Sequence, residues 1–339
     1  MRNTYDLRVG IVGAGLIGAK RAEAIITTCQ GKLVAIADVD RKRAKTLAMK
    51  YQADPMATWK DLISRGDIDA VIVAVPNAHA APIVLSTLKS GKHVFCEKPL
   101  GINSKEALKI VNAAKRAGKT VKVGFNHRFH AAILKAHEIC EAGGIGQVLL
   151  IRARYGHGGR KGMEKEWRFD RKISGGGELL DQGVHLIDLA RWFAGEFDRV
   201  YGMTPTKFWH TKVEDNAFAL MMNRQVTVSF HASTTNWKNI FSFEVFGETG
   251  FLQVDGKGGS YGEEALTYGR RKPEFGVPDL EVFRFPGEDL SWEREWENFV
   301  HGVAGSGKII GGAMDGFLAN TIVDAIYRSS RSRREVKLK

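Results

Sequence analysis

Three side chains in this sequence are of the types that move protons: Lys98, Asp181 and His185. Lys98 follows the apolar run HVFC and precedes Pro99, which has no amide hydrogen to donate and therefore ends strand pairing. Asp181 and His185 are four residues apart, so both lie on one face if the surrounding segment is helical. Lys98 is either an exposed lysine without a function or a functional group that the end of a strand holds in place.

A glycine-rich turn near the amino terminus predicts a dinucleotide site. The string GAGLIG places Gly13, Gly15 and Gly18 in GxGxxG spacing, with Leu16 and Ile17 between the second and third glycines. The first glycine permits a tight turn, the second lets a pyrophosphate approach the backbone, and the third allows helix and strand to pack closely. A glycine-rich turn without a ligand is the alternative, but the position of the string between a predicted strand and a predicted helix favours NAD.

Asp38 indicates which dinucleotide is bound. It ends the second predicted strand, twenty residues after Gly18, where a carboxylate accepts hydrogen bonds from the ribose hydroxyls and repels a 2′-phosphate. Asp40 adds to this preference, whereas the basic run at 41–43 could pair with the phosphate of NADP. We expect that run to be an exposed helix face. NAD is therefore the predicted cofactor, with NADP as the alternative.

The first 125 residues alternate strands and helices. Five near-continuous apolar runs are typical of parallel strands covered on both faces, at residues 7–13, 32–38, 68–76, 92–98 and 120–125. Helical patterns lie between them, at residues 41–51, 79–91 and 103–119. The last pattern has a cap at Asn103 or Ser104 and ends at Gly118. This alternation predicts an α/β, Rossmann-type doubly wound parallel sheet over residues 1–125.

Residues 126–339 show the pattern of an α+β domain with a large, open, mostly antiparallel sheet. Six runs predict its strands, at residues 147–156, 200–210, 213–223, 225–234, 241–247 and 250–256. Helices are expected at residues 177–195 and near 291–304 and 311–330. We expect this domain to bind the substrate and to mediate oligomerisation, and its C-terminal segment could pack back on the first domain.

Four motifs together resemble the glucose–fructose oxidoreductase and inositol dehydrogenase (Gfo/Idh/MocA) family. They are GAGLIG at 13–18, AVPNAHA at 74–80, CEKPLG at 96–101 and GGGELLDQGVHLID at 175–188. Their order and spacing cover nearly the whole chain. The resemblance implies an NAD(P)-dependent oxidoreductase that acts on CH–OH groups. It also implies that Lys98, with Pro99 in a cis peptide, forms a catalytic set with Asp181 and His185.

The chemistry of alcohol oxidation suggests a role for each member of this set. We expect His185 to be the base, because imidazole titrates near neutral pH, and Lys98 to hold the oxygen and relay its proton. Asp181 would orient a neighbouring hydroxyl or Lys98, and Asp188 could orient the imidazole. Lys98 is the alternative base, since burial favours a neutral amine. No motif supplies the third ligand that a metal site would need, so no metal is predicted.

Further candidates follow the predicted strands at the edge of the sheet where ligands bind. The resemblance implies that cofactor contacts come from Pro76, Asn77, His79, Glu97 and Lys98. His79 could equally be a residue that only begins a helix. Asn126 and Arg128 resemble the family's substrate edge, and we expect His127 between them to be solvated.

A basic, glycine-rich segment at residues 152–177 leads into the predicted helix. Its candidate substrate contacts are cationic or aromatic: Arg152, Arg154, Tyr155, Arg160, Lys165, Trp167 and Arg168. Arginines clamp phosphate or carboxylate through paired hydrogen bonds, and the alternating residues Arg152 and Arg154 share one strand face. We therefore predict an acidic or nucleotide-linked sugar as substrate. A loop whose charges face water or a neighbouring subunit is the alternative.

The predicted reaction is the NAD-dependent oxidation of a secondary hydroxyl of a sugar or sugar derivative to a keto group, or its reverse. An inositol, another polyol or a simple aldose is the alternative substrate. Two other functions stay open, an NAD-dependent glycosidase with no net redox change and a catalytically silent NAD-binding regulator. The intact set of Lys98, Asp181 and His185 argues against the regulator.

Composition limits the partners of this chain. Of its net charge of +12, six basic residues and one acidic residue place +5 in residues 328–339 without any nucleic-acid-binding motif. We expect a solvated tail or a packed final strand there, and no nucleic acid. The absence of an 18-residue apolar run predicts no membrane span, and three scattered cysteines without a signal peptide predict a cytoplasmic protein. The open sheet predicts a homodimer or homotetramer.

Overall fold

A computed structural model describes residues 7–338 of the chain. These residues divide into two compact units, which are described separately. The first unit holds the chain up to Asn126 together with Trp292–Asn320, and the second holds His127–Ser291 and the segment from Thr321 onward. The division of function between residues 1–125 and 126–339 stays a prediction.

The first unit is built on a parallel sheet of six strands in the order β3-β2-β1-β4-β5-β6. The strands are β1 Arg8–Val12, β2 Lys32–Ala37, β3 Asp54–Met56, β4 Ala70–Val73, β5 His93–Cys96 and β6 Val121–Val123. The strand order reverses direction between β1 and β4, which is where doubly wound sheets bind dinucleotides. This sheet confirms the Rossmann-type prediction.

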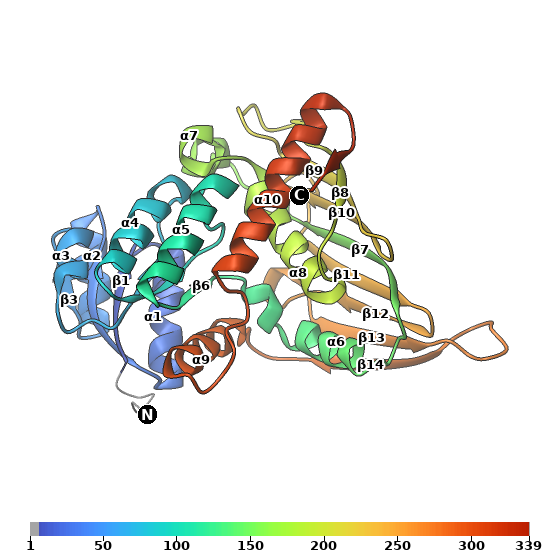
Figure 1. The fold of residues 1–339 in the computed structure, drawn as a ribbon, viewed down its shortest axis with the longest axis horizontal. Helices are drawn as coiled ribbons and strands as arrows, with labels where there is room; N and C mark the ends of the chain where they lie inside the picture. The colour runs from blue at the N-terminus through green and yellow to red at the C-terminus, as the bar shows by residue number, and fades with distance from the viewer. Residues whose placement is uncertain (1–6, 339) are drawn as a thin grey trace. The chain divides into compact units, whose positions relative to one another are not determined.

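Helices cover both faces of this sheet. They are α1 Leu16–Thr28, α2 Arg41–Lys50, α3 Trp59–Ser64, α4 Asn77–Lys89, α5 Ser104–Ala117 and α9 Ser291–Ala304. Helices α1 and α9 lie side by side (Figure 1), and Ile25, Trp296 and Phe299 join the buried residues of β1 and β5 in one core. The predicted caps of α5 are confirmed, because Asn103 accepts a hydrogen bond from the Glu106 amide and Gly118 is left-handed.

β3 and α3 were not predicted from the sequence, for physical reasons. β3 has only three residues and contains Pro55, which is tolerated there because the strand lies at the edge of the sheet. α3 has six residues, too few to show helical periodicity, and begins where the Thr58 side chain accepts a hydrogen bond from the Asp61 amide.

The second unit is built on nine strands in the order β14-β13-β12-β11-β7-β10-β9-β8-β15. The strands are β7 Val148–Gly156, β8 Arg199–Met203, β9 Asn216–Met222, β10 Thr227–Ser233, β11 Ile240–Gly247, β12 Gly250–Asp255, β13 Glu264–Arg270, β14 Asp279–Phe285 and β15 Val336–Lys337. β7 is parallel to β10 and antiparallel to β11. The sheet is mostly antiparallel, as predicted, but its strand order does not follow the chain. The strands β13 and β14 were not predicted.

The strand predicted at 200–210 is too long. β8 ends at Met203, and the following loop is held by Asp215, whose carboxylate accepts hydrogen bonds from the amides of Lys207, Phe208 and Trp209 at 2.7–2.9 Å. Three amides that bond to one carboxylate cannot also bond to a neighbouring strand. Farther along, β15 pairs with β8, so residues 336–337 form the packed final strand that was one alternative for the tail; Lys339 lies outside the described residues.

Helices α6 Ala131–Glu141 and α8 Val184–Ala194 pack against this sheet, α6 on β12 and β13 and α8 on β7 (Figure 1). The helix predicted at 177–195 is only partly α-helical, because Leu179–Gly183 forms a π-helical turn before α8. The predictions at 291–304 and 311–330 are confirmed by α9 and by α10 Ala313–Ser332. In the described part of the chain, no helix combines the length and the apolar composition needed to cross a bilayer.

Candidate active site

The glycine-rich turn between β1 and α1 leaves one position open. A Cβ at Gly13 would lie 2.2 Å from the carbonyl oxygen of Ala74, and a Cβ at Gly18 would lie 1.8 Å from that of Gly13. Packing within the protein therefore requires glycine at both positions. A Cβ at Gly15 would meet nothing within 4 Å, so the turn is open where a pyrophosphate is expected to approach, and Ile17 beside it is half-buried. These residues fit a dinucleotide.

Asp38 is held next to the same turn. Its carboxylate accepts hydrogen bonds from the amide of Ala14, at 2.6 Å, and from that of Asp40, at 2.8 Å. Two apolar side chains near it are uncovered, Leu16 at 75% exposure and Val39 at 101%. Exposed apolar side chains beside a fixed carboxylate suit a ligand with a flat ring and a ribose.

The basic run at 41–43 forms the exposed first turn of α2, as predicted. Asp40 caps this helix by accepting hydrogen bonds from the amides of Lys42 and Arg43. The Arg43 guanidinium also lies 3.3 Å from the Asp40 carboxylate. The helix cap thus gives one of these cations a carboxylate partner within the chain.

Other predicted cofactor and substrate residues follow the strands of the first sheet at its carboxyl edge. Pro76 precedes α4, Asn77 is its buried first residue, and His79 is exposed in the first turn. Asn126, 8% exposed, begins a 3₁₀ turn that follows β6.

Lys98 follows β5 at this same edge and is half-buried. The Lys98–Pro99 peptide bond is cis, as the family resemblance implied. The carboxylate of Glu97, which was predicted to contact the cofactor, accepts a hydrogen bond from Arg21 Nε at 2.6 Å. Glu97 thus has a strong partner inside the protein.

The candidate base belongs to a cluster of three buried rings in the second unit. His185 is in the first turn of α8 and is 4% exposed. Its ring centroid lies 3.8 Å from that of His127 and 6.3 Å from that of Tyr155, and the last two rings meet edge to face at 5.0 Å. The expectation that His127 is solvated is wrong, since it is 2% exposed. The whole run from Val121 to His130 is buried, so tertiary packing and not charge controls this segment.

Asp181 lies in the π-helical turn that leads into α8 and is half-buried. The Arg168 guanidinium is 3.6 Å from its carboxylate. Because residues 179–183 are π-helical, the α-helical spacing assumed for Asp181 and His185 is only partly correct.

A buried glutamate that was not predicted holds this turn. Glu214 Oε1 accepts hydrogen bonds from the amides of Gly177 and Leu179, at 3.0 and 3.2 Å, and from the Tyr327 hydroxyl at 2.6 Å. Burial raises the pKa of Glu214, although these hydrogen bonds act in the opposite direction. A single carboxylate thus connects α10 to the backbone that carries Asp181.

Arg128 forms a buried pair with Asp188. Its Nε and terminal nitrogen donate to the two carboxylate oxygens at 2.7 and 2.6 Å, and both side chains are at most 5% exposed. The residue predicted to bind substrate and the residue predicted to orient His185 therefore hold each other. This bidentate pair ties the 3₁₀ turn after β6 to α8.

Those predicted substrate contacts of the basic segment that belong to β7 lie on two different faces of the strand. Arg152 and Arg154 are exposed on β7, whereas Tyr155 is buried on the opposite side of the strand with the histidine rings. Period-two alternation requires this separation. Arg152 pairs across the sheet with Glu244 at 2.5 Å.

Two arginines in the rest of that segment pair with a glutamate of the same segment. Glu166 lies 2.5 Å from Arg160 and 3.5 Å from Arg168, whose guanidinium also stacks on Trp167 at 4.7 Å. Lys165 is exposed. Among the predicted arginines, Arg168 contacts a candidate catalytic residue, Asp181.

Two residues of the loop after β12 were missed by the sequence analysis. Lys257 Nζ lies 4.4 Å from the ring centroid of Tyr261 and 5.3 Å from that of Tyr155. Burial raises the pKa of Tyr155 well above its usual range and that of Tyr261 to about 12, so both phenols are neutral at physiological pH. Within residues 7–338, no group of three or more histidine, cysteine or carboxylate side chains is arranged to hold a metal ion.

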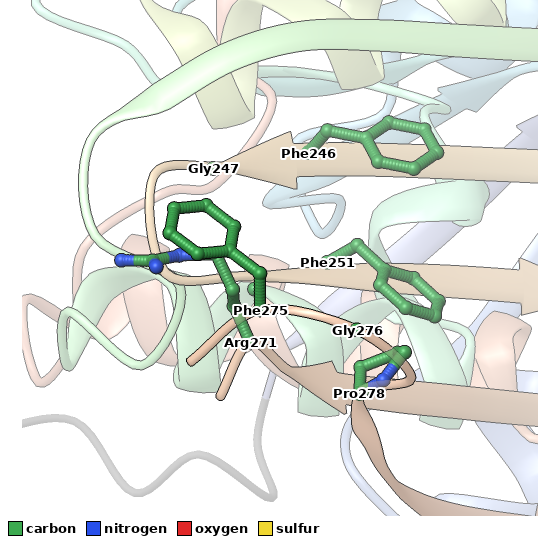
Figure 2. Close-up of a pocket in the computed structure, with 8 residues that line it drawn as sticks. Phe246, Gly247, Phe251, Arg271, Phe275, Gly276 and Pro278 are labelled. Carbon is green, nitrogen blue, oxygen red and sulfur yellow. The ribbon is translucent and has the colours of Figure 1, made fainter. Parts of the chain in front are cut away.

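A separate hollow lies where β11 to β14 turn back on one another (Figure 2). It has a volume of about 290 Å³ and is lined by Phe246, Phe251, Phe275, Arg271 and Pro278 with three glycines. None of the residues lining it is a predicted site residue.

Comparison with known proteins shows relatives over almost the full chain. Residues 7–125 match the model of an oxidoreductase family with an NAD-binding Rossmann fold, and residues 133–253 match the Gfo/Idh/MocA C-terminal domain. An inositol 2-dehydrogenase of Rubrobacter xylanophilus is 30% identical, over 96% of this chain and 91% of its own length. The chain belongs to the Gfo/Idh/MocA family.

Membership of the Gfo/Idh/MocA family confirms three predictions. The first unit is an NAD-binding Rossmann domain, the protein is an oxidoreductase, and the resemblance seen in the motifs was correct. A levoglucosan dehydrogenase of Pseudarthrobacter phenanthrenivorans is also 30% identical, over 59% of this chain and 54% of its own. A solved levoglucosan dehydrogenase, in complex with NADH and levoglucosan, shares the fold with a TM-score of 0.91 at 23% identity, covering 98% of this chain and 99% of that one.

Proposed function

We propose that this protein is an NAD-dependent dehydrogenase that oxidises a secondary hydroxyl of a neutral ring-shaped polyol or sugar to a ketone, or catalyses the reverse reduction. The observation that carries the proposal is the buried imidazole of His185, packed on His127 and Tyr155 and following the turn of Asp181. The relatives named for inositol and for levoglucosan, both ring compounds with secondary hydroxyls, support the substrate class.

Each candidate residue has a proposed role. The glycine-rich turn at Gly15 and the Asp38 carboxylate would hold NAD, which would supply the hydride acceptor for the alcohol carbon. His185 takes the hydroxyl proton, and the rings of His127 and Tyr155 keep water from two sides of the imidazole and fix its plane. Lys98 donates a hydrogen bond to the reacting oxygen and stabilises its developing negative charge. Asp181 accepts a hydrogen bond from a neighbouring hydroxyl, and Arg168 holds it.

Asp38 supports NAD over NADP. Its carboxylate is fixed by two backbone amides beside the glycine-rich turn, where it would accept from the ribose hydroxyls and repel a 2′-phosphate. The pairing of Arg43 with Asp40 leaves that cation less available to a phosphate.

An acidic sugar is the second candidate substrate. Lys257, over the rings of Tyr155 and Tyr261, and Arg168, beside Asp181, are two cations near the ring cluster that could pair with a carboxylate. If the substrate is acidic, Lys257→Met should raise KM for a uronic acid by about tenfold and leave KM for a neutral polyol unchanged.

The exposed face of the second sheet supports a homo-oligomer. Met203, Phe218 and Leu220 are 39–52% exposed on β8 and β9, and the register places Arg152 and Arg154 on the same face. We expect these arginines to belong to a subunit contact and not to the substrate site. Light scattering at micromolar concentration should give a mass that is a multiple of 37.5 kDa. Leu220→Glu should reduce that mass. A monomeric mass for the wild-type protein would contradict the homo-oligomer.

Absorbance at 340 nm with NAD or NADP and a substrate panel tests the proposed function. The panel contains myo-inositol, levoglucosan, free aldoses, uronic acids and nucleotide sugars. His185→Ala and Lys98→Met should each lower kcat by about 10²- to 10⁴-fold, and Arg65→Gln, remote in the sequence from every proposed role, should not. NADH from neutral substrates supports the proposal, and NADH only from acidic sugars supports the second candidate. No NADH with any member, while NADH still binds, contradicts both and favours the glycosidase or the silent regulator.

A further inference from the structure

Arg21 is a cation with no exposed surface that contacts the residue next to Lys98. Its terminal nitrogen lies 2.6 Å from Glu97 Oε1 and 2.8 Å from Glu295 Oε2, and its Nε donates to the same Glu97 oxygen at 2.6 Å. The side chains of Arg21 and Glu295 are 0% exposed and that of Glu97 is 13% exposed. One guanidinium thus joins α1, the strand end that precedes Lys98 and α9.

Two aromatic rings restrict the orientation of this guanidinium. Its carbon lies 4.2 Å from the ring centroid of Phe95 and 4.4 Å from that of Trp292. Phe95 in turn packs on Phe299 and Trp296 of α9. The two rings and the two carboxylates hold the guanidinium in one position. Because Glu97 is paired with this guanidinium, its own side chain has little freedom to move.

The loop that carries Lys98 is also held on both sides. Before it, the Glu97 amide donates to the Val73 carbonyl, and the Gly124 amide donates to that of Cys96, both at 2.9 Å. After it, the Gly101 carbonyl accepts from the Asn320 side chain, which is 1% exposed, at 2.9 Å. Lys98 therefore projects from a short segment anchored at Glu97 and at Gly101.

A purely stabilising role is a poor explanation for this cluster. Lys122, also buried, contributes to the electrostatics of Glu295, so two cations face the two carboxylates of Glu97 and Glu295. Removing charges from water is costly, and apolar side chains of similar volume often stabilise a protein equally well or better. An ion pair also fixes the orientation of its two side chains, because the guanidinium and the carboxylate hydrogen-bond best in one mutual arrangement.

We propose that Arg21 and Glu295 are positioning residues for Lys98. They hold Glu97, and through it the backbone from which Lys98 projects, while Asn320 holds the other side of the loop. This inference rests on the proposed function of Lys98. It gives Glu97 a structural task in place of the predicted cofactor contact.

The test compares Lys98 with a lysine of the same segment. Trace acetic anhydride is applied to the full-length protein, and mass spectrometry measures the labelling of Lys98 relative to exposed Lys105. Arg21→Lys retains the charge but cannot make the forked contacts, so the ratio should change by about threefold or more. Asn320→Ala should change it in the same sense. Arg65→Lys is the matched control, since Arg65 also joins two carboxylates, and it should leave the ratio unchanged.

Kinetics with the best substrate of the panel provides the second measurement. Arg21→Lys should lower kcat by about tenfold, while NADH affinity, measured by its fluorescence, changes less than about twofold. Glu295→Gln, which keeps the size of the side chain, serves if Arg21→Lys does not fold. An unchanged labelling ratio in folded variants overturns the inference, whether or not the affinity for NADH falls. A changed ratio without any effect on kcat leaves the positioning intact and contradicts instead the proposed role of Lys98.

Discussion

Two arginines of the first unit each join two carboxylates, but in opposite surroundings. Arg21 lies 2.6 Å from Glu97 and 2.8 Å from Glu295, and the three side chains are 0%, 13% and 0% exposed. Arg65 lies 2.5 Å from Asp54 and 2.8 Å from Asp67, and these side chains are 22%, 68% and 39% exposed. The distances are nearly equal, so water is the main difference between the two clusters.

The difference in exposure to water reverses the direction in which the pKa of the carboxylate shifts. Burial raises the pKa of Glu295 even though Arg21 is beside it. Hydrogen bonds from Arg65 and Arg8 lower the pKa of Asp67, which remains in contact with water. The same ion-pair geometry thus favours the charged carboxylate at the surface and is outweighed by desolvation in the core.

The largest expected effect is the loss of the buried arginine. Arg21→Gln removes the cation that contacts both Glu97 and Glu295, so the free energy of unfolding should fall by about 3–5 kcal/mol in urea titrations. A loss below about 1 kcal/mol would mean that water reaches these carboxylates, and the contrast between the two clusters would disappear.

A glycine beside each cluster gives the next test. A Cβ at Gly124 would lie 2.6 Å from Glu97 Oε2 and 3.0 Å from the Arg21 guanidinium, whereas a Cβ at Gly66, next to Arg65, would meet nothing within 4 Å. Gly124→Ala should therefore cost about 1–3 kcal/mol of stability. Gly66→Ala is the matched control and should change stability by less than about 0.5 kcal/mol. Equal effects of the two variants, by thermal or urea unfolding, would contradict the packing argument.

The pH dependence of stability should have opposite signs at the two clusters. The pKa of Glu295 is raised above its usual 4.5, so its contribution to stability is fully present below that pH and is lost as pH rises through the folded-state pKa. The pKa of Asp67 is lowered from 3.8, so its contribution is present above that pH and is lost as pH falls through the folded-state pKa.

Urea unfolding of single variants over a range of pH separates these contributions. Glu295→Gln should make stability less dependent on pH above 4.5 and not below it. Asp67→Asn should remove dependence only in the acid range below 3.8. The reverse assignment, or no change with either variant, would contradict the stated causes of the two shifts.

The smallest effect is expected for the exposed arginine. Arg65→Gln should lower the free energy of unfolding by less than about 1 kcal/mol, since water replaces the ion pairs, and added salt should reduce the difference further. A loss as large as that of Arg21→Gln, measured in the same buffer, would show that exposure does not distinguish these clusters.

Local chemistry made part of this protein predictable from its sequence. The GxGxxG turn, the caps of α5 at Asn103 and Gly118 and the apolar strands of the first sheet depend on neighbours within a few residues, and each was predicted. The order of four motifs along the chain was enough to indicate the family.

Features that depend on distant residues were not predictable in this way. Arg21 stands in AKRAEA, which is typical of an exposed helix, but contacts with Phe95 and Glu97 and with α9, some 270 residues later, bury it. Arg152 and Tyr155 belong to one basic segment in the sequence, but the pleat of β7 separates them to opposite faces. The sequence determined which groups could do chemistry, while the tertiary structure decided which were removed from water, because burial is set by residues far away in the chain.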